Sequence, residues 1–113
     1  AMCTKSQLEA IEEEMVNYYR SVYGDSIDTI ILYGSYARGD YSDDSDIDIT
    51  AIVRGNRVEL QKKLKKMWDF STEVGLAYDV IVSPTVIPYD EFEQYKEKLP
   101  YYSNIVKEGR KIG

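Results

Sequence analysis

The sequence predicts an α/β (α+β) domain in which a small mixed sheet carries helices mainly on one face. Three segments show apolar residues at helical spacing, and three shorter apolar runs between them are typical of buried strands. They follow one another in the order helix, strand, loop, strand, helix, strand, helix. With 113 residues the chain fits one domain, 1–113, because a chain of this length buries roughly two-thirds of its unfolded surface in a single core.

The first helix is expected over residues 6–23. Ser6 and Glu9 have the spacing of a capping box, apolar residues then recur at helical spacing, and Gly24 ends the pattern. The next run, 29–33, is rich in β-branched residues and continuously apolar. This pattern is typical of a strand that is covered on both faces.

Residues 34–45 are rich in Gly, Ser and Asp, which predicts a loop with one helical turn beginning at Ser35. The following strand, 46–53, begins with a strict alternation of Asp and Ile, so one of its faces starts polar. A helix is then expected over 56–74, with Gly75 as its stop.

The third apolar run, 77–82, is expected to form another buried strand, although it contains the acidic residue Asp79. A helical region follows Pro88, is interrupted by Pro100 and resumes over 102–108. One face of the sheet has to stay open if the polar side chains of the strands are to act.

The charge balance argues against nucleic acid as a partner. Asp and Glu outnumber Lys and Arg by 20 to 14, and a net charge of −6 repels a polyanion. The one basic run, 62–66, lies in a predicted helix and indicates a solvated helix face. No apolar stretch reaches the length of a membrane span and residues 1–4 lack a signal-peptide core, so a cytoplasmic protein without membrane contact is expected.

The chain has no histidine and one cysteine, Cys3. This composition excludes His-based catalytic triads, His-ligated zinc and an internal disulfide. Acid–base chemistry is left to carboxylates, Lys, Tyr or a metal-bound water.

The strand 46–53 projects Asp46 and Asp48 from the same face, with Cα atoms roughly 6.6 Å apart. Two carboxylates held this close repel each other, and a divalent cation between them removes that cost. Mg²⁺ prefers oxygen ligands and keeps waters and substrate phosphates in its other positions. If 77–82 is the neighbouring strand, Asp79 joins them as a third ligand and as the nearest candidate base. Three carboxylates can hold two metal ions about 4 Å apart, as in phosphoryl transfer.

The end of the first strand offers a phosphate site. Gly34 permits a close approach of phosphate to the backbone, and Ser35 adds a hydroxyl and an N–H at the start of a helical turn. Arg38 lies one turn further on, where it could bind phosphate oxygens or pair with a loop Asp. Tyr36 and Tyr41 flank this loop and could stack on a nucleotide base.

A calcium-binding loop is the rival interpretation, because Asp44, Asp46 and Asp48 have the required alternation. It fails at two positions. Ile49 stands where that loop needs Gly, and Gly55 stands where it needs Glu.

Gly34-Ser35, ten further residues and then Asp46-Ile47-Asp48 resemble the signature of the DNA polymerase β-like nucleotidyltransferase superfamily, and the surrounding residues are similar to its minimal nucleotidyltransferase (MNT) branch. The resemblance spans residues 28–83. It implies the polymerase β-like fold and transfer of a nucleoside monophosphate from a nucleoside triphosphate, with release of pyrophosphate.

The resemblance also implies a role for each matching residue. The metal ligands would be Asp46, Asp48 and Asp79, with Asp79 also the base. The contacts to the triphosphate would be Gly34 and Ser35, with Arg38 as a further nucleotide-binding residue.

The size of the chain resembles the antitoxin of HEPN/MNT toxin–antitoxin pairs. That likeness implies ATP as substrate, two Mg²⁺ ions, and adenylylation of a tyrosine on a HEPN-type partner. Two alternatives stay open: an antitoxin that neutralises its partner by binding alone, and an aminoglycoside-like nucleotidyltransferase for a small molecule, working as a homodimer. The acceptor, the nucleotide base and the oligomeric state are not fixed by the sequence.

Overall fold

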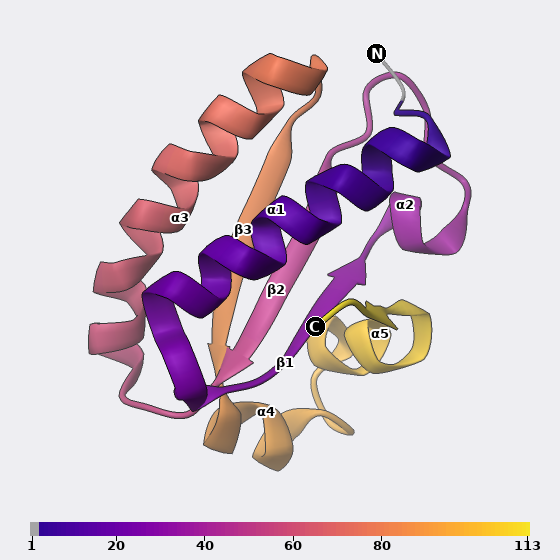
Figure 1. Ribbon diagram of the computed structural model, residues 1–113. Helices are drawn as coiled ribbons and strands as arrows, with labels where there is room; N and C mark the ends of the chain where they lie inside the picture. The colour runs from indigo at the N-terminus through magenta and orange to yellow at the C-terminus, as the bar shows by residue number, and fades with distance from the viewer. Residues whose placement is uncertain (1–2) are drawn as a thin grey trace.

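A four-stranded mixed sheet organises the protein (Figure 1). The computed structural model describes residues 3–113. The strands follow the spatial order β3-β2-β1-β4. The two central strands, β1 (Ile27–Tyr33) and β2 (Ile47–Val53), are antiparallel. The edge strands are β3 (Val82–Pro88), parallel to β2, and β4 (Arg110–Lys111), antiparallel to β1.

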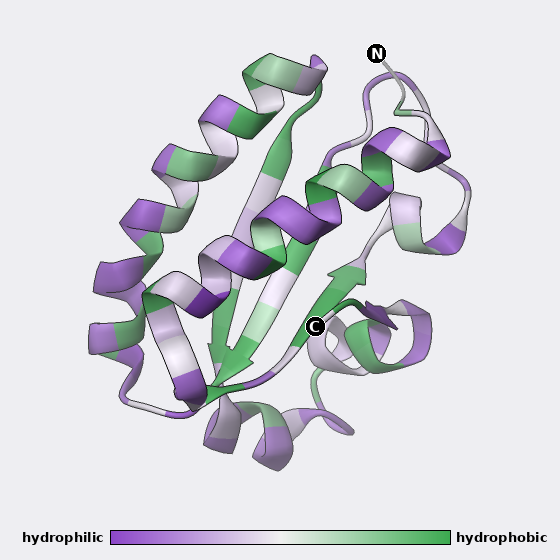
Figure 2. Ribbon diagram, in the orientation of Figure 1, coloured by the Kyte–Doolittle hydropathy of each residue, from purple (hydrophilic) through white to green (hydrophobic). Residues whose placement is uncertain are grey.

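Two long helices, α1 (Lys5–Tyr23) and α3 (Arg57–Tyr78), cover one face of the sheet. Their outward surfaces are hydrophilic, while the strands behind them are mostly hydrophobic (Figure 2). Alternate residues of the strands meet the two helices in the main core, which includes Ile11, Met15, Met67, Ile30, Leu32, Ile47 and Ile49, each fully buried. The expected mixed sheet with helices mainly on one face is confirmed.

The opposite face of the sheet is covered at one end only. There α4 (Tyr89–Tyr95) and α5 (Pro100–Glu108) pack on the strands. The second core contains Ile31, Ile52, Ile87, Phe92, Tyr102 and Ile105. Ile31 therefore faces away from Ile30 and Leu32, which confirms that β1 is covered on both faces along this stretch. The other end of this face carries polar side chains.

The first helix begins one residue earlier than expected and uses a different cap. Thr4 is the N-cap residue, and its hydroxyl accepts a hydrogen bond from the Gln7 N–H at 3.1 Å. The Gln7 side chain in turn accepts from the Thr4 N–H at 2.9 Å. The pair Ser6 and Glu9 was the wrong choice because Thr4 and Gln7 have the same spacing two residues closer to the chain start.

The expected strand over 77–82 is wrong, and so is the expected stop at Gly75. The helix α3 continues through Gly75 to Tyr78, and Asp79 ends it in the left-handed conformation, with φ 56°. A Cβ on Gly75 would lie 2.5 Å from the carbonyl oxygen of Val80, so this glycine permits a close approach instead of ending the helix. The strand itself begins only at Val82.

The C-terminal part differs in two ways from expectation. Pro100 is the first residue of α5, where its missing N–H costs nothing, so it starts a helix instead of interrupting one. The short strand β4 was not expected. It is held to the body of the protein by Arg110, whose guanidinium donates to the carboxylate of Glu12 at 2.6 and 3.3 Å.

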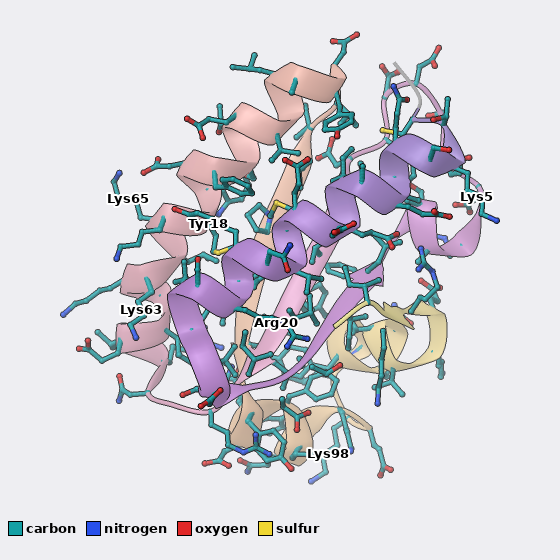
Figure 3. The ribbon with its side chains drawn as sticks, in the orientation of Figure 1. Lys5, Tyr18, Arg20, Lys63, Lys65 and Lys98 are labelled. Atoms are coloured by element: carbon teal, nitrogen blue, oxygen red, sulfur yellow. The ribbon has the colours of Figure 1, made fainter. Side chains whose placement is uncertain are left out.

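The lysines of 62–66 are exposed, and Lys63 and Lys65 point away from the protein (Figure 3). This confirms that the basic run is a solvated face of α3. None of the helices in residues 3–113 has the length and apolar character that crossing a membrane would require.

Candidate active site

Two carboxylates lie on the open, polar end of the sheet. Asp46 directly precedes β2, and Asp48 is the second residue of that strand. In the sheet Asp48 lies between Tyr33 of β1 and Ser83 of β3, and the hydroxyl of Ser83 is 3.5 Å from the Asp46 carboxylate. The alternation of β2 therefore brings the two carboxylates together on one face, as the sequence predicted.

The electrostatics of Asp48 reflect this crowding. Burial raises the pKa of its carboxyl group, and the nearby charge of Asp46 raises the pKa further, while the positive charge of Arg38 acts in the opposite direction. Ionised Asp48 is thus destabilised in its surroundings. A cation bound between the two carboxylates would relieve that cost.

The glycine at the end of β1 lies against Asp48. Gly34 has φ 74° and ψ −158°, a conformation that is essentially restricted to glycine. A Cβ at this position would lie 2.3 Å from a carboxylate oxygen of Asp48. Ser35 then begins the short helix α2 (Ser35–Arg38), which confirms the expected helical turn. Gly34 consequently lies directly against Asp48, and Ser35 follows it in the chain.

Arg38 is held by two carboxylates on the surface. Its Nε donates to Asp40 at 3.2 Å, and its terminal nitrogen donates to Glu108 at 3.1 Å. The pairing with a loop Asp is one of the two possibilities that the sequence left open. The contact with Glu108, which comes from α5 and links that helix to α2, was not predicted.

Asp79 is not placed as the sequence predicted. It sits at the C-terminal end of α3, outside the sheet, while β3 carries no acidic residue. The register instead sets Ser83 beside Asp48 and Thr85 beside Thr50. The neighbouring strand therefore presents hydroxyl groups to the open face where a third carboxylate was expected.

Tyr36 and Tyr41 do not form an open sandwich for a base. Their rings stack on each other with centroids 4.2 Å apart, and Tyr36 is buried. The Tyr36 hydroxyl accepts a hydrogen bond from the backbone N–H of Cys3 at 3.3 Å. The hypothesis that both rings stack on a nucleotide base is wrong for Tyr36, because Tyr41 already covers its ring.

Two tyrosines on the open face were missed from the sequence. The hydroxyls of Tyr33 and Tyr101 are 2.9 Å apart. Burial raises the pKa of Tyr33, and the hydrogen bond with Tyr101 raises it further. The place of Tyr33 directly before Gly34 is a signal that could have been used. Tyr101 offers none, because only the packing of α5 brings it here.

Thr50 is buried on the same face, two residues beyond Asp48. Its hydroxyl is the one buried side-chain oxygen or nitrogen in residues 3–113 that lacks a hydrogen-bond partner. We expect Thr50→Val to raise the free energy of unfolding by about 1 kcal/mol, since it removes an uncompensated buried polar group. Urea denaturation measures this change. Thr85→Val is the control, because the Thr85 hydroxyl bonds to the carbonyl of Ile49 and its loss brings no gain.

A lower stability of Thr50→Val would contradict this expectation. It would mean that the hydroxyl is hydrogen-bonded in solution, for example by an ordered water.

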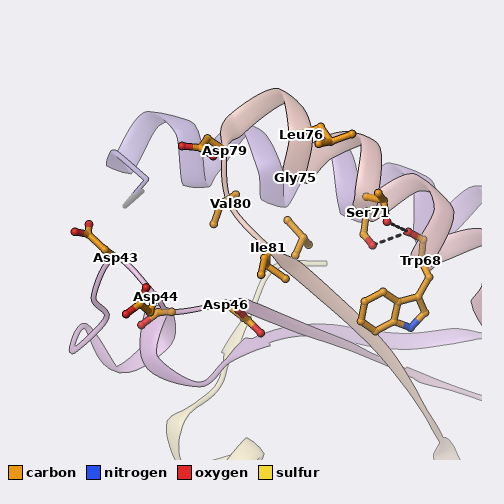
Figure 4. Close-up of a pocket in the computed structure, with 13 residues that line it drawn as sticks. Asp43, Asp44, Asp46, Trp68, Ser71, Gly75, Leu76, Asp79, Val80 and Ile81 are labelled. Carbon is orange, nitrogen blue, oxygen red and sulfur yellow. Dashed lines mark hydrogen bonds between the residues drawn. The ribbon is translucent and has the colours of Figure 1, made fainter.

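A groove of about 480 Å³ lies next to the carboxylate pair, between α3 and the segment that leads into β2 (Figure 4). Asp46 lines it together with the acidic loop residues Asp43 and Asp44. Asp79 lies at its rim, and Trp68 of α3 lies toward the other end. The groove thus connects the outer side of α3 to the candidate site.

The residues present fit one Mg²⁺ ion. Mg²⁺ is commonly held by one or two carboxylates together with substrate phosphates and waters, which is the donor set that Asp46, Asp48 and a bound triphosphate offer. Within residues 3–113 no group of three or more His, Cys, Asp or Glu side chains is arranged to hold a metal ion. The expected three-carboxylate cluster for two ions is therefore not formed by the described residues.

Comparison with known proteins identifies the family of the chain. Residues 9–112 match the nucleotidyltransferase domain family. Two relatives from Methanocaldococcus jannaschii carry the provisional name of protein adenylyltransferase. One is 32% identical over 97 residues, covering 78% of this chain and 96% of the relative. The other is 36% identical over 98 residues, covering 87% and 90%.

Solved structures share the fold at low sequence identity. A chain in the crystal structure of a MntA–HpeT toxin–antitoxin variant superposes with a TM-score of 0.57 and 16% identity, covering 90% of this chain and 72% of that chain. A chain in the complex of a tri-AMPylated Shewanella oneidensis HEPN toxin with MNT antitoxin gives a TM-score of 0.53 and 16% identity, covering 95% and 71%. With its carboxylate pair, strand-end glycine and family match over residues 9–112, the chain belongs to the nucleotidyltransferase domain family and is a nucleotidyltransferase.

Proposed function

We propose that this nucleotidyltransferase transfers AMP from ATP to a tyrosine hydroxyl of a HEPN-type partner, with Mg²⁺, and acts as the antitoxin of that partner. The observation that carries the proposal is the pair Asp46 and Asp48 on one face of the sheet, with Asp48 held against Gly34. The name of the two archaeal relatives supports a protein acceptor. Structures of the same fold described as a toxin–antitoxin with AMP-PNP and as a tri-AMPylated HEPN toxin complex support the nucleotide and the partner.

Each part of the site has a task in this reaction. Gly34 and Ser35 receive the triphosphate, since the glycine leaves room for phosphate oxygens beside the backbone. Asp46 and Asp48 hold Mg²⁺, which supplies neutralisation of the triphosphate charge when bound. The acceptor oxygen attacks the α-phosphorus, the bond from that phosphorus to the bridging oxygen breaks, and pyrophosphate leaves. The hydroxyl proton passes to solvent.

Arg38 and Asp79 have other places in the proposal. Two of the five N–H groups of Arg38 donate to Asp40 and Glu108, and the others remain to donate to a phosphate, so Arg38 is proposed as an additional contact beside the site. Asp79 is left out of the metal ligands and of the base role, because it lies at a helix end and not on the strand beside Asp48.

The test uses ATP labelled on either the α- or the γ-phosphate, with the HEPN-type protein encoded beside this chain as acceptor. We expect the α-label, and not the γ-label, to appear on the partner, and we expect excess EDTA to abolish the transfer. Replacing the modified tyrosine of the partner by Phe should remove the label. Comparison of the four nucleoside triphosphates measures the base preference.

Three results would contradict the proposal. Neutralisation of the partner without any label would point to an antitoxin that acts by binding alone. Label on an aminoglycoside and not on a protein would point to a small-molecule enzyme. Transfer that survives the chelator would remove the metal from the reaction.

A further inference from the structure

The groove beside Asp46 exposes large apolar side chains. Trp68, Leu76 and Ile81 line it, and they are 43%, 81% and 62% exposed. Three of the eight large hydrophobic residues that are exposed in residues 3–113 therefore gather in one place. An exposed apolar surface that is bordered by polar groups is typical of an interaction site.

The charged groups of the same groove all have one sign. Asp43, Asp44, Asp46 and Asp79 line it, and no Lys or Arg does. In Figure 4, Asp43, Asp44 and Asp79 lie toward one end of the groove and Trp68 lies toward the other. Asp46 also belongs to the proposed metal site, so an occupant of the groove is brought next to the reacting phosphate.

We infer that this groove docks the acceptor protein through a segment that combines an aromatic or aliphatic anchor with Lys or Arg residues. The inference rests on the proposed function and adds where the acceptor binds. The apolar anchor covers Trp68 and Leu76, and the basic side chains face the loop acids Asp43 and Asp44. The segment then leads the acceptor hydroxyl toward Asp46.

Charge and groove size select this occupant. A second copy of the chain would bring a net charge of −6 to a groove whose charged residues are all acidic, whereas a basic segment is attracted to it. A volume of about 480 Å³ holds a few side chains and not a folded domain. Strand addition is also disfavoured, because the edge strand β3 contains Pro84 and ends at Pro88, and proline cannot donate to a ladder.

The apolar half of the groove is tested with Trp68→Ala and Leu76→Ser. The matched control is Val58→Ser on the same helix, since Val58 is 60% exposed and does not line the groove. We expect each groove variant to raise the KM for the acceptor protein on the order of tenfold or more, as for aromatic anchors of interfaces. The kcat, the Kd for ATP and the melting temperature should stay unchanged. Leu76 is so exposed that its replacement does not endanger the fold.

The acidic half is tested by reversing the charge of Asp43 and Asp44 together. This double Asp→Lys variant should raise the KM for the acceptor and weaken its dependence on salt. Glu13→Lys is the control, because Glu13 is an exposed residue of α1 and does not line the groove. It should leave both quantities unchanged.

Two assays separate this inference from the proposed function. If the unaltered protein transfers no label to a protein, the proposed function fails before the groove is tested. If transfer occurs and the groove variants keep the KM of the control, the docking site is elsewhere and the inference is overturned. The inference would also be overturned if the groove variants lost as much activity toward a small tyrosine derivative as toward the acceptor protein. A groove variant that changed the oligomeric state and left the KM unchanged would overturn it too.

Discussion

Asparagine at position 48 is expected to leave a folded protein that transfers nucleotide roughly a thousandfold more slowly or not at all. In the proposed reaction a bound Mg²⁺ would stabilise charge in the transition state by several kcal/mol, and a neutral amide at this position would weaken its binding. Asp46→Asn is expected to act in the same direction, because both carboxylates face the same side of β2. Label transfer from α-labelled ATP measures the loss.

Although Asp48→Asn lowers activity, we expect it to preserve or raise thermal stability at neutral pH. Burial and Asp46 raise the pKa of Asp48 in the folded protein. The folded state therefore binds a proton more tightly than the unfolded chain, and ionisation costs stability as the pH rises above about 4. Asn removes this cost, so the variant should melt at or above the wild-type temperature at neutral pH, with a smaller difference in acid.

A variant that keeps its activity would contradict the assignment of Asp48 to the metal. A variant that loses both activity and thermal stability would contradict the electrostatic account. Ile49→Ala is a suitable contrast, since Ile49 is fully buried in the main core and its truncation should cost stability of roughly 2–5 kcal/mol.

Alanine in place of Gly34 is expected to disable the site through geometry alone. The new Cβ would meet a carboxylate oxygen of Asp48 at 2.3 Å, so that the carboxylate has to move. A displacement of about 1 Å in a reacting site can cost on the order of a hundredfold in rate. The backbone at φ 74° and ψ −158° adds a strain of roughly 1–3 kcal/mol. Transfer kinetics and urea denaturation measure the two effects.

Gly39→Ala is the control that separates backbone strain from the steric clash with Asp48. Gly39 also has a positive φ, of 89°, but no atom lies within 4 Å of the position that its Cβ would take. We expect it to lose stability by about 1 kcal/mol and to retain activity. Equal losses of activity in the two variants would mean that the contact with Asp48 is unimportant.

The central half of the fold could be predicted from the sequence because its signals are local. The β-branched apolar run of β1 favours a strand, and the alternation at the start of β2 favours a strand with one polar face. The same alternation places Asp46 and Asp48 on one face without any knowledge of the neighbours. The helical turn at Ser35 follows from a glycine that ends a strand.

The end of α3 and the start of β3 were predicted wrongly because they depend on contacts that a short sequence pattern does not contain. The apolar run 77–82 suits a buried helix end as well as a strand. Gly75 packs against the carbonyl of Val80 and lets the helix continue, and the true strand, Val82–Pro88, contains two prolines, which are uncommon in strands. The link between Arg38 and Glu108 and the approach of Tyr101 to Tyr33 depend on α5, which lies far away in the sequence.

The alternation of β2 assigns hydrophobic packing to one face of the strand and the carboxylate chemistry to the other. Its odd-numbered residues, Ile47 to Val53, lie in the main core, whereas Asp46, Asp48 and Thr50 face the open side. Point substitutions at Asp46 and Asp48 can therefore alter the chemistry while the hydrophobic packing stays intact, whereas Ile52, further along the same face, belongs to the second core. A single inserted or deleted residue within β2 would exchange the two sets, burying the carboxylates and exposing isoleucine. We expect the family to vary in length in the loop before β2 and to keep the strand itself free of insertions.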